Sequence, residues 1–83
     1  LYGGDGADTL TGNRGSDTLF GGAGNDILNE SGDESNTLFG GDGDDNVQGG
    51  DGADSLKGDE GNDLIYGGAG NDVIDGSDGG VGL

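Results

Sequence analysis

The stretch Gly21-Gly22-Ala23-Gly24-Asn25-Asp26-Ile27-Leu28-Asn29 decides how this chain folds. Its first six residues are turn formers that end in an acid, because glycine tolerates positive φ and asparagine and aspartate favour turns. Its last three residues have strand character, with an aliphatic side chain in the middle. Almost the same nonapeptide recurs at residues 67–75, and most of the remaining chain repeats the pattern. The sequence is therefore a tandem array of short units, which can bury apolar surface only by stacking on one another.

The repeats keep a single register over residues 3–75, apart from one slip. Three regular repeats occupy residues 3–29 and four occupy residues 40–75, and their positions are numbered one to nine. Residues 76–83 are a degenerate end without the aspartate of position six. We expect residues 1–83 to form a single module that is a fragment of a longer protein.

The fourth repeat is irregular. Glu30 counts as one residue too many, so the damaged copy is assigned to residues 31–39. In this copy Glu34 stands at position four, where the other repeats have glycine, and Asn36 stands at position six, where they have aspartate. We therefore expect any ligand site built on this repeat to be weak.

Two columns of residues recur at fixed positions. Position eight is aliphatic, at Leu10, Leu19, Leu28, Leu38, Val47, Leu56, Ile65 and Ile74. Position six is acidic, at Asp8, Asp17, Asp26, Asp45, Asp54, Asp63 and Asp72, with Asn36 as the exception.

The period predicts an all-β, two-sheet solenoid with 18 residues in each winding. Six turn residues reverse the chain and three residues form a short strand, in which alternation sends position eight inward and positions seven and nine outward. Odd repeats then form one parallel sheet and even repeats the other, with the position-eight column as the core. Phe20 and Phe39, at position nine of neighbouring even repeats, should form an outward apolar patch, either through cross-strand packing or as a docking surface.

The composition requires a stabilising partner. The chain has 24 glycines and a net charge of −16, which is typical of chains too polar to fold unaided. Eighteen acids against two basic residues disfavour nucleic acid and anionic membranes and favour a hard divalent cation. The absence of cysteine and histidine removes thiolate sites and the commonest zinc ligand. No apolar run is long enough for a membrane span, and no signal-peptide pattern is present.

The pattern Gly-Gly-x-Gly-x-Asp-x-aliphatic-x resembles the RTX, or haemolysin-type, calcium-binding repeat over about residues 1–75. The resemblance implies a right-handed parallel β-roll with calcium between the turns of adjacent windings. It also implies secretion from Gram-negative bacteria, commonly by a type I route, as part of a toxin, protease, lipase or surface protein.

The predicted ligands are oxygens from stacked turns. Calcium takes six to eight oxygens and accepts backbone carbonyls, and turns 18 residues apart should lie above one another. The predicted carboxylate ligands are Asp8, Asp17, Asp26, Asp45, Asp54, Asp63 and Asp72. By resemblance the carbonyl ligands come from positions one to four, and those expected are Gly4, Gly6, Gly22, Gly24, Gly41, Gly43, Gly50, Gly52, Gly61, Gly68 and Gly70.

Pairing of position-six residues across one winding predicts four strong sites, at Asp8–Asp26, Asp26–Asp45, Asp45–Asp63 and Asp54–Asp72. Two weak sites would involve Asn36, so we expect about four to six calcium ions in all. Six further acids, Asp5, Asp33, Asp42, Asp51, Asp59 and Glu60, are expected to form a solvated face.

The predicted function is a calcium-binding module that folds on binding calcium after secretion and has no catalytic activity itself. Its expected partners are calcium ions and neighbouring domains of the parent chain, which could itself be a secreted enzyme. The alternative is a structural extender repeat of a large adhesin or surface-layer protein. Paired carboxylates could also serve a glycosidase, but no acid differs from the others and there is no cleft-forming insertion except around Glu30.

Overall fold

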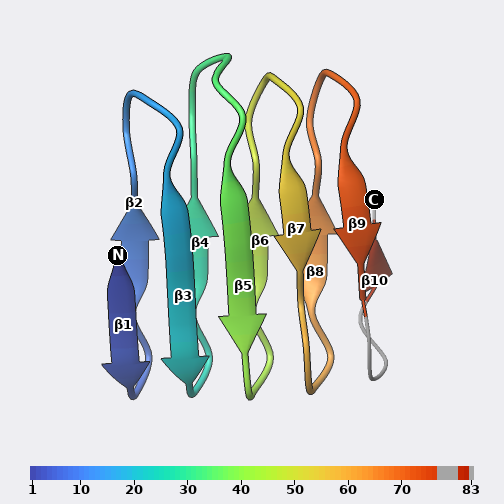
Figure 1. Cartoon of the computed structure of the whole chain (residues 1–83). Helices are drawn as coiled ribbons and strands as arrows, with labels where there is room; N and C mark the ends of the chain where they lie inside the picture. The colour runs from blue at the N-terminus through green and yellow to red at the C-terminus, as the bar shows by residue number, and fades with distance from the viewer. Residues whose placement is uncertain (77–80, 83) are drawn as a thin grey trace.

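The computed structural model describes residues 1–76, 81 and 82, and in these residues the chain forms ten strands and no helix. One parallel sheet contains β1 (Tyr2–Asp5), β3 (Thr18–Ala23), β5 (Thr37–Gly41), β7 (Ser55–Lys57) and β9 (Val73–Asp75). The other contains β2 (Thr9–Thr11), β4 (Ile27–Asn29), β6 (Asn46–Gln48), β8 (Leu64–Tyr66) and β10 (Val81–Gly82). Successive strands alternate between the sheets, and the chain advances as a right-handed parallel β-roll (Figure 1).

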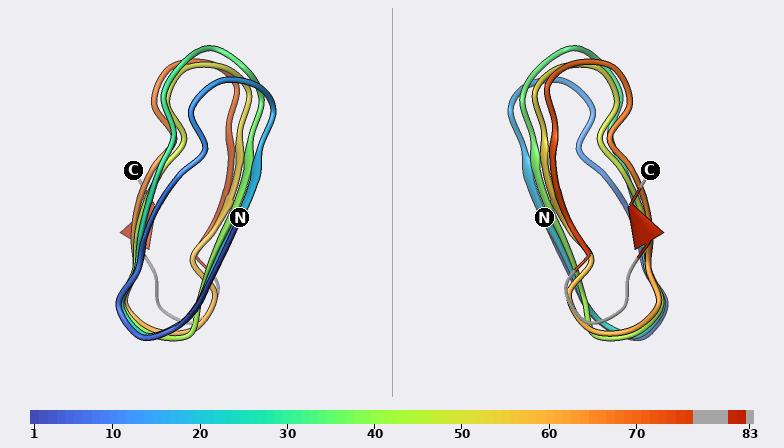
Figure 2. Two further views of the ribbon diagram at one scale, coloured as in Figure 1. Left: turned by 90° about the vertical axis from the view of Figure 1, so that its left-hand side faces the viewer. Right: turned by 90° about the vertical axis from the view of Figure 1, so that its right-hand side faces the viewer.

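The windings superimpose closely when viewed along the roll (Figure 2). Each sheet forms one long side of a flattened loop, and the turns form its two narrow ends. The pairing register follows the repeat, because Leu10 pairs with Leu28 in one sheet and Leu19 with Leu38 in the other. The predicted fold and the assignment of odd and even repeats to separate sheets are confirmed. The predicted degenerate end falls partly outside the described residues, at 77–80 and 83, whereas β10 pairs in parallel with β8.

The core consists of one column of position-eight side chains from each sheet. The seven buried hydrophobic residues are Leu10, Leu19, Leu28, Leu38, Val47, Leu56 and Ile65. The prediction that Ile74 joins this core is wrong, since its side chain is 36% exposed. Ile74 lies in β9, which pairs with β7 and is the last strand of its sheet in the described part of the chain. Leu10, which lies in the terminal strand β2 of the other sheet, is only 6% exposed, so the two ends of the core are not equally covered.

Three strands are longer than the predicted three residues. β1, β3 and β5 extend into the glycines that begin the following turn, where Gly22 pairs with Gly4 and with Gly41. Position nine of the same strands forms an aromatic column. The rings of Phe20 and Phe39 stack with centroids 4.9 Å apart, and Tyr2 lies 5.4 Å from Phe20. The predicted cross-strand packing is therefore confirmed.

The structure corrects the assignment of the fourth repeat. The Glu30 N–H donates to the carbonyl of Gln48 at 2.9 Å, and Gly49 donates in the same way to Tyr66 at 3.0 Å. Glu30 is therefore not a surplus residue, because it occupies position one of its repeat. The additional residue lies in the turn over residues 31–35, which projects beyond the neighbouring turns between β4 and β5 (Figure 1).

Exposure at the end of the core leads to a stability prediction. Leu38→Ala should lower the free energy of unfolding by about 2–5 kcal/mol, because it opens a cavity in a fully enclosed part of the core. Ile74→Ala should cost clearly less, because that side chain already contacts water. Urea unfolding in saturating calcium, followed by far-UV circular dichroism, measures both. Equal losses would contradict a core that ends before β9.

Candidate metal centres

The turns stack in two columns, one at each narrow end of the roll. The odd edge consists of residues 3–8, 21–26, 40–45 and 58–63, which lie at the bottom of Figure 1. The even edge consists of residues 12–17, 30–36, 49–54 and 67–72, which lie at the top. The space between two stacked turns of one edge is termed a seam.

Position-six carboxylates link the turns of the odd edge. Asp8 N–H donates to Asp26 Oδ1, Asp26 N–H to Asp45 Oδ1 and Asp45 N–H to Asp63 Oδ1, each at 2.8 Å. Asp26, Asp45 and Asp63 thus each use one oxygen to hold the backbone of the preceding winding. The sequence predicted these neighbours from their spacing, but it could not show that Oδ1 is already engaged by an amide.

The even edge has the same ladder, with one amide in place of an acid. Asp17 N–H donates to Asn36 Oδ1 at 2.9 Å, and Asn36 N–H donates to Asp54 Oδ1 at 2.8 Å. Asp54 N–H then donates to Asp72 Oδ1 at 2.9 Å. Asn36 therefore maintains the stacking of the turns, but it removes one negative charge from the middle of the edge.

The second carboxylate oxygen of these acids has no protein partner. Six such buried oxygens accept no hydrogen bond, namely Oδ2 of Asp8, Asp17, Asp26, Asp45, Asp54 and Asp63. A buried polar atom without a partner is costly, and a buried charge is more so. A repeated row of unsatisfied anionic oxygens therefore indicates cation sites along both edges.

Backbone carbonyls face the same seams. Gly22 and Gly24 have φ of 99° and 104°, and a Cβ on either would collide with the carbonyl oxygen of Gly4 or Gly6 in the preceding winding. The same steric relation recurs at Gly41, Gly43, Gly61, Gly68 and Gly70. Glycine is thus needed where carbonyls crowd the adjacent turn, and its absence of a side chain leaves those oxygens available to an ion.

All eleven glycines predicted as carbonyl ligands have positive φ. The prediction omitted several residues with the same backbone conformation in equivalent turns. Gly15 has φ of 95°, and the non-glycine residues Asn13 and Asp59 have φ of 69° and 65°. Asparagine and aspartate tolerate this conformation better than other side chains, so the turn geometry survives their substitution for glycine.

The donor set fits a hard cation. In the described part of the chain, no group of three or more histidine, cysteine, aspartate or glutamate side chains converges on one point. An ion in a seam would therefore be held by at most two side-chain carboxylates, and carbonyl oxygens would complete its shell. Oxygen-only coordination with several backbone carbonyls is the preference of calcium, whereas magnesium retains water and needs a stricter octahedron.

Comparison with family models gives a direct identification. The model of the RTX calcium-binding nonapeptide repeat, which spans four copies, matches residues 1–29, 30–64 and 48–80. The chain belongs to the RTX calcium-binding nonapeptide repeat family. RTX repeats form a structural calcium-binding module and occur in secreted bacterial proteins. The first two matches meet between residues 29 and 30, where the irregular RTX repeat begins.

Comparison with curated proteins and with solved structures gave no match. Among the described residues, no helix is long and apolar enough to cross a membrane.

Burial perturbs several acids of these RTX turns. Burial, together with the charges of Asp63 and Asp26, raises the pKa of Asp45 from 3.8 to about 7. Burial is also the main cause of the raised pKa values of Asp54 and Asp63. Without a cation, the folded edges therefore hold protons more tightly than an unfolded chain would.

The sign of this effect predicts acid stabilisation of the calcium-free chain. Because the pKa of Asp45 is higher in the folded state, the free energy of unfolding in chelator should rise as pH falls from about 7 towards 3.8. Far-UV circular dichroism in chelator should show more β-structure at the acid end. Asp45→Asn should weaken this pH dependence, because it removes a carboxyl group whose pKa burial raises to about 7. A β-structure signal that decreases on acidification would contradict a raised pKa of Asp45 in the folded state.

Proposed function

We propose that the chain is a calcium-dependent folding module of a larger secreted bacterial protein and is not catalytic itself. It is disordered where calcium is scarce and folds where calcium is plentiful. The observation that supports this most directly is the row of buried, unpartnered Oδ2 atoms beside crowded carbonyls on both edges.

The proposed carboxylate ligands are the seven position-six aspartates, and the proposed carbonyl ligands are the eleven glycines expected from the sequence. Four seams have an aspartate in both turns, and the two that include Asn36 bring the proposed total to between four and six ions. Each seam offers an unpaired carboxylate oxygen, and most seams also have backbone carbonyls at the adjacent turn, which is the kind of oxygen ligand that calcium takes.

The energetics favour folding that depends on the ion. The core contains seven buried aliphatic side chains, whereas the whole chain has a net charge of −16. Free calcium at 100 times a site's Kd adds about 2.7 kcal/mol for each site. Four sites would add on the order of 10 kcal/mol, which is comparable with the total stability of a small domain.

Calcium-dependent folding is compatible with secretion. A chain that stays unfolded at low calcium remains suitable for export from a Gram-negative cell by a type I route, and it folds after reaching calcium outside. The occurrence of RTX repeats in secreted bacterial proteins supports this proposal. Neighbouring domains of the parent chain are the proposed protein partners, and the exposed Tyr2 and Phe20 rings offer an apolar contact surface.

A calcium titration of the isolated chain tests the proposal. Far-UV circular dichroism should change from coil to β-structure as calcium is added, and magnesium at the same concentration should leave the chain unfolded. Full β-structure in chelator at neutral pH would refute calcium-dependent folding. Failure to fold in millimolar calcium would refute the claim that this chain is a sufficient folding module.

Sharing of acids between seams gives a second test. Asp45 is linked by hydrogen bonds to Asp26 and to Asp63 and thus borders two seams, whereas Asp8 is linked only to Asp26. Asp45→Asn should therefore reduce the calcium-dependent gain in stability by roughly twice as much as Asp8→Asn. Asparagine preserves the Oδ1 acceptor, as Asn36 does, so the comparison isolates charge. Urea unfolding at fixed calcium measures both, and equal losses would exclude shared ligands.

A further inference from the structure

Glu30 is a buried acid outside the repeat pattern. Its side chain is 3% exposed, and neither Oε1 nor Oε2 accepts a hydrogen bond of ordinary geometry. It occupies position one, where every other repeat has glycine. A carboxylate at this place needs a separate explanation, because burial without a partner is costly.

Position one faces the acid of its own repeat. A Cβ placed on Gly12 would lie 2.7 Å from Asp17 Oδ2, and one placed on Gly49 would lie 2.6 Å from Asp54 Oδ2. A side chain at position one therefore enters the space of the position-six carboxylate. In the fourth repeat, position one has gained an acid and position six, at Asn36, has lost one. The two changes compensate each other in charge.

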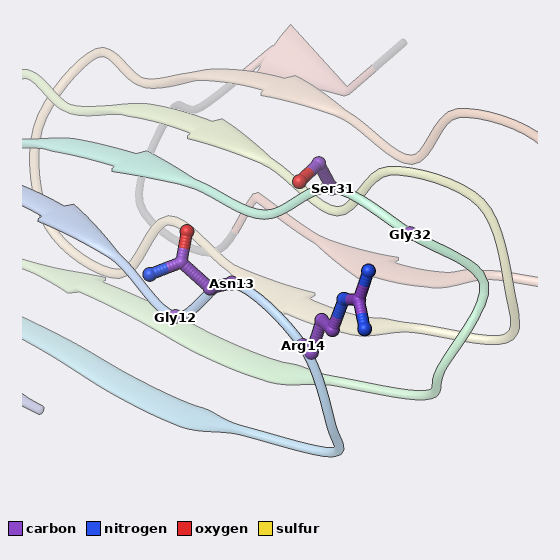
Figure 3. Close-up of a pocket in the computed structure, with 5 residues that line it drawn as sticks. All are labelled: Gly12, Asn13, Arg14, Ser31 and Gly32. Carbon is purple, nitrogen blue, oxygen red and sulfur yellow. The ribbon is translucent and has the colours of Figure 1, made fainter.

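The Glu30 carboxylate extends towards the preceding turn of the even edge. A Cβ on Gly12 would collide with Glu30 Oε2, and the same Cβ would approach Asp17 Oδ2. Two unpartnered carboxylate oxygens thus converge beside Gly12, in the seam between repeats two and four. A groove lined by Gly12, Asn13, Arg14, Ser31 and Gly32 opens between these turns (Figure 3).

No basic side chain neutralises this pair of acids. The ion pair found among the described residues joins Lys57 Nζ to Asp75 Oδ2 at 3.9 Å, and Arg14 is exposed. The amides of Gly12 and Ser31 favour the ionised form of Glu30, but burial and the charge of Asp17 outweigh them and raise its pKa. The location therefore has two acids and no basic side chain in an ion pair with either of them among the described residues.

We propose that Glu30 is a calcium ligand that replaces the carboxylate lost at Asn36. Together with Asp17 it binds an ion in the seam between repeats two and four, and carbonyls of these turns complete the shell. The inference rests on the proposed function and extends it, because the acid comes from position one. The longer glutamate side chain and the additional residue in the 31–35 turn provide the reach and the space.

The test counts calcium ions. Isothermal titration with calcium alone should show fewer ions bound per chain in Glu30→Gln than in the unsubstituted protein. Asp33→Asn is the matched control, because Asp33 is an exposed acid of the same turn and the variant loses the same charge. This control should bind as many ions as the unsubstituted protein. The double variant Glu30→Gly with Asn36→Asp restores the regular pattern and should recover the ion lost in Glu30→Gln.

The outcomes separate the two proposals. If Glu30→Gln binds as many ions as Asp33→Asn, Glu30 is not a ligand and calcium-dependent folding remains intact. If Glu30→Gln fails to fold, the double variant decides, and a double variant without the recovered ion overturns the inference. If the unsubstituted protein binds no calcium, the proposed function fails as well.

Discussion

The structure depends on the two oxygens of each position-six aspartate. Oδ1 accepts the backbone N–H of the preceding winding, as Asp26 does from Asp8, and so fixes how two turns stack. In six of the seven, Oδ2 stays buried in the seam without a partner. The same side chain thus sets the spacing of the windings and adds a buried negative charge that repels the acids of the neighbouring turns. A cation in the seam would convert that repulsion into attraction, because it would bind the oxygens that the stacking leaves unsatisfied.

The two sheets alone contribute little to the stability of the β-roll. Parallel sheets are usually covered on both faces, whereas here only the inner face is covered. Outward residues such as Thr9, Ile27 and Leu64 are exposed. The core is one residue wide in each sheet, and Ile74 shows that it loses cover where the stack of described windings ends. The edges must therefore provide much of the stabilisation that the core does not, and the proposed calcium sites would supply it there.

Most of the fold follows from the period of the sequence. A strict nonapeptide with one aliphatic and one acidic column permits a single register, so the sheet assignment and the neighbours of Asp26 and Asp45 are predictable. Atomic roles within a turn are less predictable. Nothing in the spacing shows that Oδ1 bonds an amide while Oδ2 remains free. A repeating pattern also does not show which end of the core is covered, since Ile74 in the terminal strand β9 is exposed whereas Leu10 in the terminal strand β2 is buried.

The fourth repeat shows why counting residues is insufficient. The nonapeptide pattern predicts Glu30 as the additional residue of the fourth repeat. The hydrogen bond from Glu30 to Gln48 contradicts this prediction, because the strand register extends through position one and leaves the turn to absorb the additional residue. This placement separates the two roles that aspartate combines elsewhere. The amide of Asn36 retains the stacking bond to Asp17, and the carboxylate of Glu30 provides the buried charge. A repeat can therefore lose its aspartate and still keep both the register and the negative charge of its edge.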